Sequence, residues 1–154
     1  METPILMSDL PLARQQLVTN IVKLYSNEGS PELVRKVYST DNNMSFEDPI
    51  SHAIGFKQVL SQWYSLQKIF AVSITEDVNI LENSPNLLRF KLDQVYTFKK
   101  PAKSKSMSSV VVLELDNNDK VINHKDLWNG KELPKKIHFL RRINAKIVKK
   151  MCYK

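Results

Sequence analysis

The order of two hydrophobic periodicities along the chain constrains its fold more than any other feature of the sequence. Up to residue 66, apolar residues recur every three or four positions, as in amphipathic helices. Beyond it, residues 69–80, 87–99, 107–116 and 120–128 alternate with a period of two, as in strands. Helices segregated from a meandering antiparallel sheet predict an α+β fold and exclude a doubly wound parallel sheet.

Capping residues mark where the predicted helices begin and end. Ser8 or Asp9 can cap a helix that runs to about Glu28. Ser30-Pro31-Glu32 places an N-cap, a first-turn proline and an acidic residue at the start of a second, short helix. A short extended piece over residues 44–49 and a third helix over residues 56–66 are expected to follow.

The composition is that of one ordinary globular domain. The 154 residues are 42% apolar and 25% charged, which is enough for a single hydrophobic core. The only cysteine, Cys152, supports neither a disulfide framework nor a thiolate metal site, and no histidine spacing is typical of a metal site. We therefore expect no metal and no cofactor. The sequence around residues 1–9 is unlike a signal peptide, which favours a cytoplasmic location, with the nucleus as an alternative.

Basic charge is concentrated in the C-terminal segment. Residues 134–154 hold eight basic residues and no acidic one, whereas the whole chain has a net charge of +7. Apolar residues repeat every three to four positions there, which predicts an amphipathic helix opened by Pro134. The repeating positions are Ile137, Leu140, Ile143 (or Asn144), Ile147 and Met151. We expect this helix to pack on, or extend from, a domain that spans residues 1–133.

The role of the basic helix has two interpretations. It can be a terminal helix whose lysines are simply solvated, or it can be attracted to an acidic protein or an anionic lipid surface. Nucleic acid is the least favoured partner, because the segment contains no recognised nucleic-acid-reading motif.

Two short segments resemble the nuclear transport factor 2-like (NTF2-like) superfamily, in particular its SnoaL-like branch. Phe46-Glu47-Asp48-Pro49, followed by Gly55-Phe56 and an aromatic-bearing helix to Leu66, resembles the opening of these proteins. His124-Lys125-Asp126-Leu127-Trp128 resembles their ending, so the resemblance spans roughly residues 9–130. It implies a curved antiparallel sheet wrapped around the N-terminal helices, a cone with a pocket at its wide end, and a homodimer formed through the outer face of the sheet.

Strand alternation places candidate catalytic groups on a common face. In residues 120–128, Ile122, His124, Asp126 and Trp128 project to one side. A carboxylate beside an imidazole favours the imidazolium, an arrangement used in general acid–base catalysis near neutral pH. The candidate catalytic residues are His124, Asp126, Tyr96 and Asp48. The alternative is that His124 and Asp126 form a satisfied buried cluster and that Asp48 caps a turn.

The candidate ligand-contacting residues come from the helix and strands expected around the pocket. Phe90, Leu92, Gln94, Tyr96 and Phe98 share one face of the strand at 87–99, which we expect to lie next to the strand at 120–128. The candidate ligand-contacting set is Phe90, Leu92, Gln94, Phe98, Trp63 and Trp128, although Trp63 can equally belong to the core.

Two functions follow from these features, and the sequence leaves open whether the protein is an enzyme. The first is a pocket that binds a small apolar molecule, with or without isomerase-, cyclase- or dehydratase-like acid–base activity. A pocket smaller than about 300 Å³ would argue against it. The second is a non-catalytic dimeric interaction module whose basic helix docks on an acidic protein or an anionic membrane. A pocket filled by its own side chains, with a helix whose apolar face is uncovered, would favour the second.

Overall fold

The computed structural model describes residues 3–153 of the chain. Met1, Glu2 and Lys154, the last of the basic residues of the C-terminal segment, lie outside this range. The helices are a 3-10 turn η1 (Met7–Asp9), α1 (Leu12–Tyr25), α2 (Pro31–Val37), α3 (Phe56–Ile69) and α4 (His138–Cys152). The strands are β1 (Ser45–Asp48), β2 (Ser51–Ile54), β3 (Phe70–Ser84), β4 (Leu87–Phe98), β5 (Ser104–Leu115) and β6 (Val121–Trp128).

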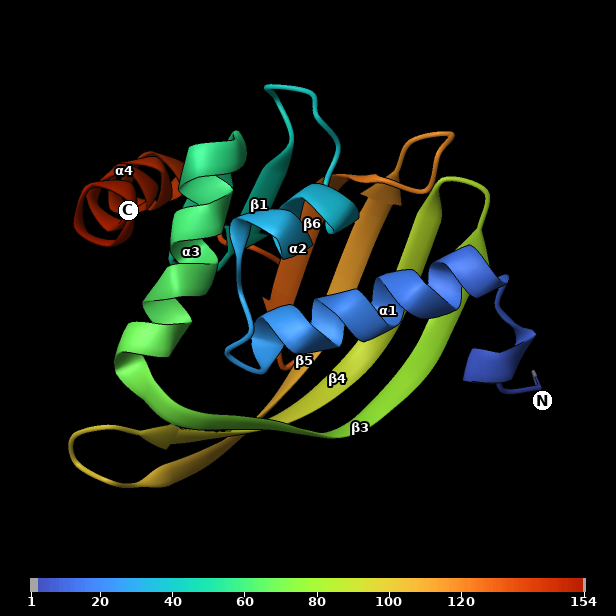
Figure 1. Ribbon diagram of the computed structural model, residues 1–154, viewed down its shortest axis with the longest axis horizontal. Helices are drawn as coiled ribbons and strands as arrows, with labels where there is room; N and C mark the ends of the chain where they lie inside the picture. The colour runs from blue at the N-terminus through green and yellow to red at the C-terminus, as the bar shows by residue number, and fades with distance from the viewer. Residues whose placement is uncertain (1–2, 154) are drawn as a thin grey trace.

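A single curved sheet forms the frame of the molecule. Its six strands lie in the order β2-β1-β6-β5-β4-β3, and the long strands β3 to β5 bend around α1 (Figure 1). The predicted α+β class is therefore confirmed. The sheet is mixed rather than wholly antiparallel, because β1 pairs parallel with β6.

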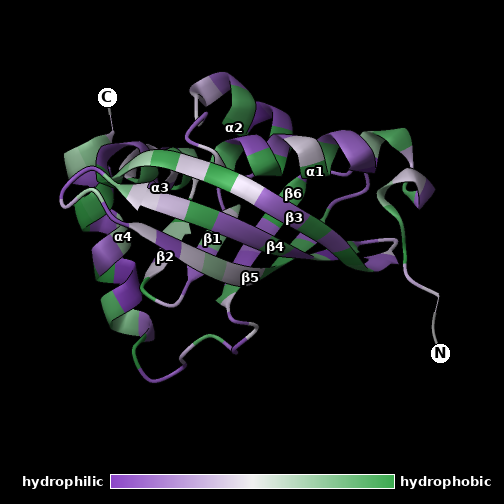
Figure 2. Cartoon of the chain, turned by 90° about the horizontal axis from the view of Figure 1, so that it is seen from below, coloured by the Kyte–Doolittle hydropathy of each residue, from purple (hydrophilic) through white to green (hydrophobic). Residues whose placement is uncertain are grey.

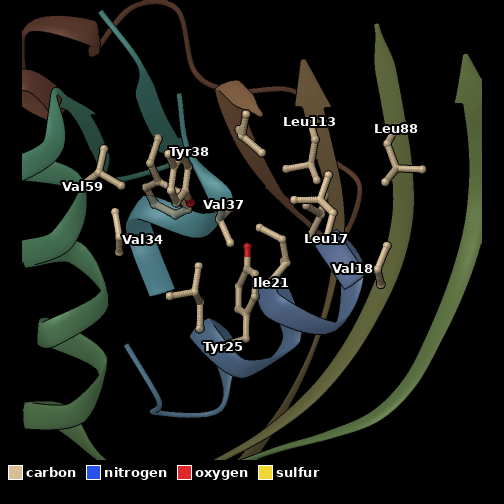
Figure 3. Close-up of a cluster of buried hydrophobic side chains, with 14 of the residues drawn as sticks. Leu17, Val18, Ile21, Tyr25, Val34, Val37, Tyr38, Val59, Leu88 and Leu113 are labelled. Atoms are coloured by element: carbon tan, nitrogen blue, oxygen red, sulfur yellow. The ribbon is translucent and has the colours of Figure 1, made fainter. Parts of the chain in front are cut away.

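The hydrophobic core fills the concave side of the sheet. Val18, Ile21 and Leu24 of α1 are fully buried, and Leu88 and Leu113 face them from β4 and β5 (Figure 3). Burying an aliphatic side chain of this kind contributes roughly 1.5–3 kcal/mol. These contacts hold α1 across the middle of the sheet, so that one end of the cone remains free for a cavity.

Several predicted boundaries differ from the observed ones. The first helix starts at Leu12 rather than at a Ser8 or Asp9 cap, because Asp9 closes η1 by accepting a hydrogen bond from the Leu6 amide. Strand β2 was not predicted, since four residues are too short for a clear alternation. Helix α4 begins at His138 instead of Pro134.

Strand β6 departs from strict alternation at its start. Leu115 pairs with Val121 but Glu114 pairs with Asn123, so Ile122 is an extra residue in a bulge. Val121 is consequently buried and Ile122 exposed, which corrects the expectation that Ile122 shares the inner face with His124 and Asp126. A second correction concerns neighbours, because β5 lies between β4 and β6.

Helix α4 packs against α3 and β2 through an unexpected face (Figure 1). Its buried residues are Arg141, Ala145 and Cys152. Arg141 Nη2 lies 3.1 Å from Glu47 Oε1, and Arg142 donates to the carbonyl of His52 and to Gln58 Oε1. The five apolar residues that predicted the helix all stay exposed.

No helix within residues 3–153 combines the length and the apolar character needed to cross a membrane.

Candidate functional site

A cavity of about 390 Å³ opens between α3, α4 and the end of the curved sheet. This volume lies within the usual range of small-molecule sites. The lining is predominantly aromatic and aliphatic, with a few polar groups, and includes Tyr25, Phe46, Trp63, Phe70, Tyr96, Phe98, Met107, Trp128 and Val148. The cavity is therefore suited to a small apolar molecule and is not filled by the protein's own side chains.

Two aspartates line this cavity on adjacent strands. Strands β1 and β6 pair with Phe46 opposite His124, and continuing that register brings Asp48 beside Asp126. Burial, followed by repulsion from Asp126, raises the pKa of Asp48 to about 7. Burial also raises the pKa of Asp126 to about 6, although hydrogen bonding from Ser109, Tyr25 and Trp128 opposes the rise. The cavity thus holds two carboxyl groups that exchange protons close to neutral pH.

Asp126 carries an oxygen that no protein group satisfies. The residue is only 6% exposed, and its Oδ1 has no hydrogen-bond partner within residues 3–153. Because unpaired buried oxygens are costly, this atom is a natural contact point for a polar group of a ligand or for water.

Asp48 both caps a turn and lines the cavity, two roles that the sequence presents as alternatives. Its Oδ1 accepts hydrogen bonds from the amides of Ile50 at 2.9 Å and Ser51 at 2.7 Å, so it does cap the turn between β1 and β2. The same side chain lines the cavity. The backbone bonds fix the carboxyl group at the cavity wall.

His124 lies behind the cavity rather than in its wall. Its Nε2 is 3.1 Å from the Tyr25 hydroxyl and its Nδ1 is 2.7 Å from the Tyr38 hydroxyl. Phe46 and Trp63 enclose the ring, and burial lowers the pKa of His124 to about 3. The expected imidazolium supported by Asp126 is therefore replaced by a neutral ring, which holds Tyr25 in place.

The remaining predicted site residues divide between cavity and core. Tyr96, Phe98, Trp63 and Trp128 line the cavity, and burial raises the pKa of Tyr96, which keeps its hydroxyl protonated. Phe90 and Leu92 are buried in the core and do not reach the cavity. Gln94 also lies outside it, where its Nε2 donates to the Ser73 hydroxyl and the Tyr25 carbonyl.

Sequence reasoning missed contributions from both terminal helices. Tyr25 of α1 and Asn144 and Val148 of α4 belong to the cavity wall. Tyr25 occupied an apolar position of a helical stripe, which gives no sign of an adjacent cavity. Asn144 stood out only as a polar interruption of the α4 pattern.

A larger hollow, of about 550 Å³, lies on the outer face of the sheet beside residues 132–138. Its walls are charged, and Arg89, Lys125 and Arg141 are already paired with Glu82, Glu114 and Glu47. The inner cavity is the stronger candidate because its buried polar groups lack such partners. No cluster of His, Cys, Asp or Glu within residues 3–153 is arranged to hold a metal ion.

Comparison with solved structures identifies the fold. No protein-family model and no curated protein sequence matches the chain. A protein assigned to the SnoaL-like polyketide cyclases from Shewanella putrefaciens CN-32 is 18% identical with a TM-score of 0.61, over 84% of this chain and 93% of that chain. An NTF2-like protein from Anabaena variabilis ATCC 29413 is 10% identical with a TM-score of 0.63, over 75% and 86%.

A third structure, a protein assigned as an isomerase of the SnoaL-like family from Agrobacterium tumefaciens str. C58, is 12% identical with a TM-score of 0.59, over 77% of this chain and 98% of that chain. Identities this low establish a shared fold and leave the activity to be argued from the site. The fold expected from the two sequence segments is confirmed.

Proposed function

We propose that this chain, which has the NTF2-like fold, binds a small apolar molecule in the inner cavity. We further propose that it catalyses a proton transfer between two positions of that molecule. One observation carries the proposal. A cavity of about 390 Å³ with largely apolar walls contains two aspartates, the buried Asp126 and the half-buried Asp48, and one oxygen of Asp126 has no partner among the described residues.

The two carboxyl groups suit different halves of an acid–base cycle. With a pKa of about 6, Asp126 is largely ionised at neutral pH and accepts a proton, whereas Asp48, with a pKa of about 7, is close to half protonated. Isomerisation, cyclisation and dehydration each use one group that removes a proton from carbon and one that donates a proton, which in a dehydration goes to the hydroxyl group that leaves as water. Tyr96, whose pKa burial raises, stays protonated and donates a hydrogen bond to the ligand, whereas the Tyr25 hydroxyl is held by His124.

His124 acts in this proposal as a positioning residue. A neutral imidazole has one donor and one acceptor nitrogen, so one of its tyrosine partners donates to the ring and the other accepts from it. This arrangement fixes the Tyr25 hydroxyl at the cavity wall without exposing the imidazole.

The competing function, a non-catalytic interaction module, is supported by one of its two expected features. The apolar side of α4 is uncovered, but the cavity is not filled by side chains. Both features are compatible with a pocket protein that also docks on a surface.

Filling the cavity tests the proposal. The neutral fluorescent dye N-phenyl-1-naphthylamine should bind saturably to the protein. The Ser65→Phe variant places a ring in the cavity, where Ser65 is part of the wall, and should weaken dye binding at least tenfold. The matched Ser106→Phe variant alters an exposed residue of β5 outside the cavity and should bind the dye normally. Absence of saturable binding, or equal affinity in both variants, would refute the pocket.

A further inference from the structure

Helix α4 exposes a continuous apolar strip, defined here as Leu140, Ile143, Ile147 and Met151. These side chains are between 38% and 68% exposed and follow each other at three- and four-residue spacing. The strip is free because the opposite side of the helix, with Arg141, Ala145 and Cys152, is the one that packs on the domain. Figure 2 shows hydrophobic and hydrophilic residues alternating along α4. Contiguous apolar surface of this kind is typical of an interaction site.

The apolar strip borders the mouth of the inner cavity. Asn144 and Val148 line the cavity. Asn144 lies one helical turn from Leu140 and from Ile147, and Val148 lies one turn from Met151.

The strip connects at two places to exposed apolar residues of the cavity wall. Asn144 Nδ2 donates to the carbonyl of Ile50 at 3.0 Å, and Lys68 Nζ donates to the carbonyl of Met151 at 2.8 Å, next to Ile69. Ile50 and Ile69 both line the cavity and are both exposed. Strip and cavity mouth therefore form one apolar surface.

Basic residues lie beside this surface, and no acidic residue occurs between residues 133 and 153. Arg141 and Arg142 are occupied by Glu47, Gln58 and backbone carbonyls. Lys146 and Lys150 of α4 remain exposed.

A second basic group lies at the same end of the molecule. Lys99, Lys100 and Lys103 occupy the tip of the β4–β5 hairpin, which Figure 1 and Figure 2 both place on the side of α3 and α4. Lys105 lines the cavity itself. An apolar centre with a basic border fits the headgroup region of an anionic bilayer.

We propose that the apolar strip and the surrounding lysines dock on an anionic membrane with the cavity mouth facing the bilayer, so that the ligand is a lipid drawn from the membrane. This rests on the proposed function of the cavity. A second copy of the chain is a poorer partner, because a two-fold contact between α4 helices would bring like charges together. An apolar ligand also concentrates in the bilayer, directly in front of the cavity mouth.

Sedimentation with vesicles tests the docking. We expect the full chain to bind vesicles of phosphatidylcholine mixed with phosphatidylglycerol, and to bind pure phosphatidylcholine vesicles much more weakly. Higher salt should reduce the binding. Replacing the exposed Lys146 and Lys150 with Gln should weaken binding to the mixed vesicles by roughly 25-fold, about fivefold for each lysine.

A matched pair of variants separates the apolar contribution from general surface effects. Ile143→Gln, Ile147→Gln and Met151→Gln together should reduce binding at least tenfold. Leu12→Gln, Ile74→Gln and Leu81→Gln change exposed apolar residues of α1 and β3 and should leave it unchanged. Both triple variants should keep N-phenyl-1-naphthylamine binding and the wild-type melting temperature, because none of the six side chains is in the core or the cavity wall.

Transfer of the same dye from mixed vesicles to the protein tests the source of the ligand. Docking predicts a rate that rises with vesicle concentration and falls at least tenfold in the α4 apolar variant.

The proposal would be overturned by sedimentation with neither vesicle type, by equal binding of both triple variants, or by a transfer rate independent of vesicle concentration. A wild-type dimer in light scattering that the α4 variant dissociates would assign the strip to a second copy instead. If the dye enters the cavity but vesicles are ignored, the proposed function stands and only the docking fails.

Discussion

Burial decides the chemistry of individual side chains at this site. Asp126 and His124 are two residues apart on β6 and both are buried, but Asp126 reaches the cavity while the imidazole is enclosed by aromatic rings. Desolvation disfavours the charged form of each, so the pKa of the carboxyl rises and the pKa of the imidazole falls. The same buried environment thus makes Asp126 an acid that exchanges its proton near neutral pH and keeps the His124 imidazole neutral, as a hydrogen-bonding partner of two tyrosines.

Replacing His124 should affect stability more than ligand binding. The His124→Leu variant leaves the hydroxyls of Tyr25 and Tyr38 without their buried partner, which should lower the free energy of unfolding by about 2–5 kcal/mol. Urea unfolding measures the loss, and Tyr38→Phe should recover part of it in the double variant. Normal stability together with lost dye binding would instead place the imidazole in the binding machinery.

The raised pKa of Asp126 predicts how stability depends on pH. An aspartate with a folded-state pKa of about 6 and a reference value of 3.8 stabilises the fold below pH 4, and this contribution is lost as pH rises through 6. The wild-type protein should therefore lose roughly 2 kcal/mol relative to Asp126→Asn between pH 4 and pH 7. Chemical unfolding at both pH values tests this; parallel profiles for the two proteins would show that Asp126 titrates normally.

At the scale of elements, local sequence patterns predicted well which segments form helices and strands. They predicted less well which face of each helix or strand packs against the rest of the protein. The order of elements followed from periodicity, because residues 56–66 and 87–98 repeat strongly within themselves. The bulge at Ile122 depends on pairing with β5, and the packing face of α4 depends on acceptors that Glu47 and the β2 carbonyls supply. These are tertiary effects, which a local pattern does not contain.

Removing residues 134–154 should preserve the fold but open the cavity. Among residues 3–153, Ala145 is the only member of the main core cluster that lies beyond residue 133, so the sheet and the first three helices keep their own packing. The truncated chain should unfold cooperatively with a lower melting temperature and lose dye binding, because Asn144 and Val148 of the cavity wall are gone. Insolubility or non-cooperative unfolding, seen by circular dichroism, would make α4 an essential part of the core.

At the scale of the whole molecule, the curved sheet brings distant segments together around one cavity. Residues from α1, β1, α3, β4, β6 and α4 meet there, although the sequence separates them by up to about 120 residues. The sequence identified Asp48, Tyr96 and Asp126 as candidates. The sequence alone does not distinguish these cavity-lining residues from Phe90 and Leu92, which lie in the core. The curvature of the sheet determines which part of each strand faces the cavity.

The central claim is that this cavity contains two carboxyl groups that exchange protons near neutral pH and contact a bound apolar molecule. Carbon NMR titration of the aspartate side chains, with and without N-phenyl-1-naphthylamine, measures this directly. We predict that Asp126 titrates near pH 6 and Asp48 near pH 7, and that both signals shift when the dye binds. Titration of both carboxyl groups near pH 4, with signals that the bound dye leaves unchanged, would contradict the account.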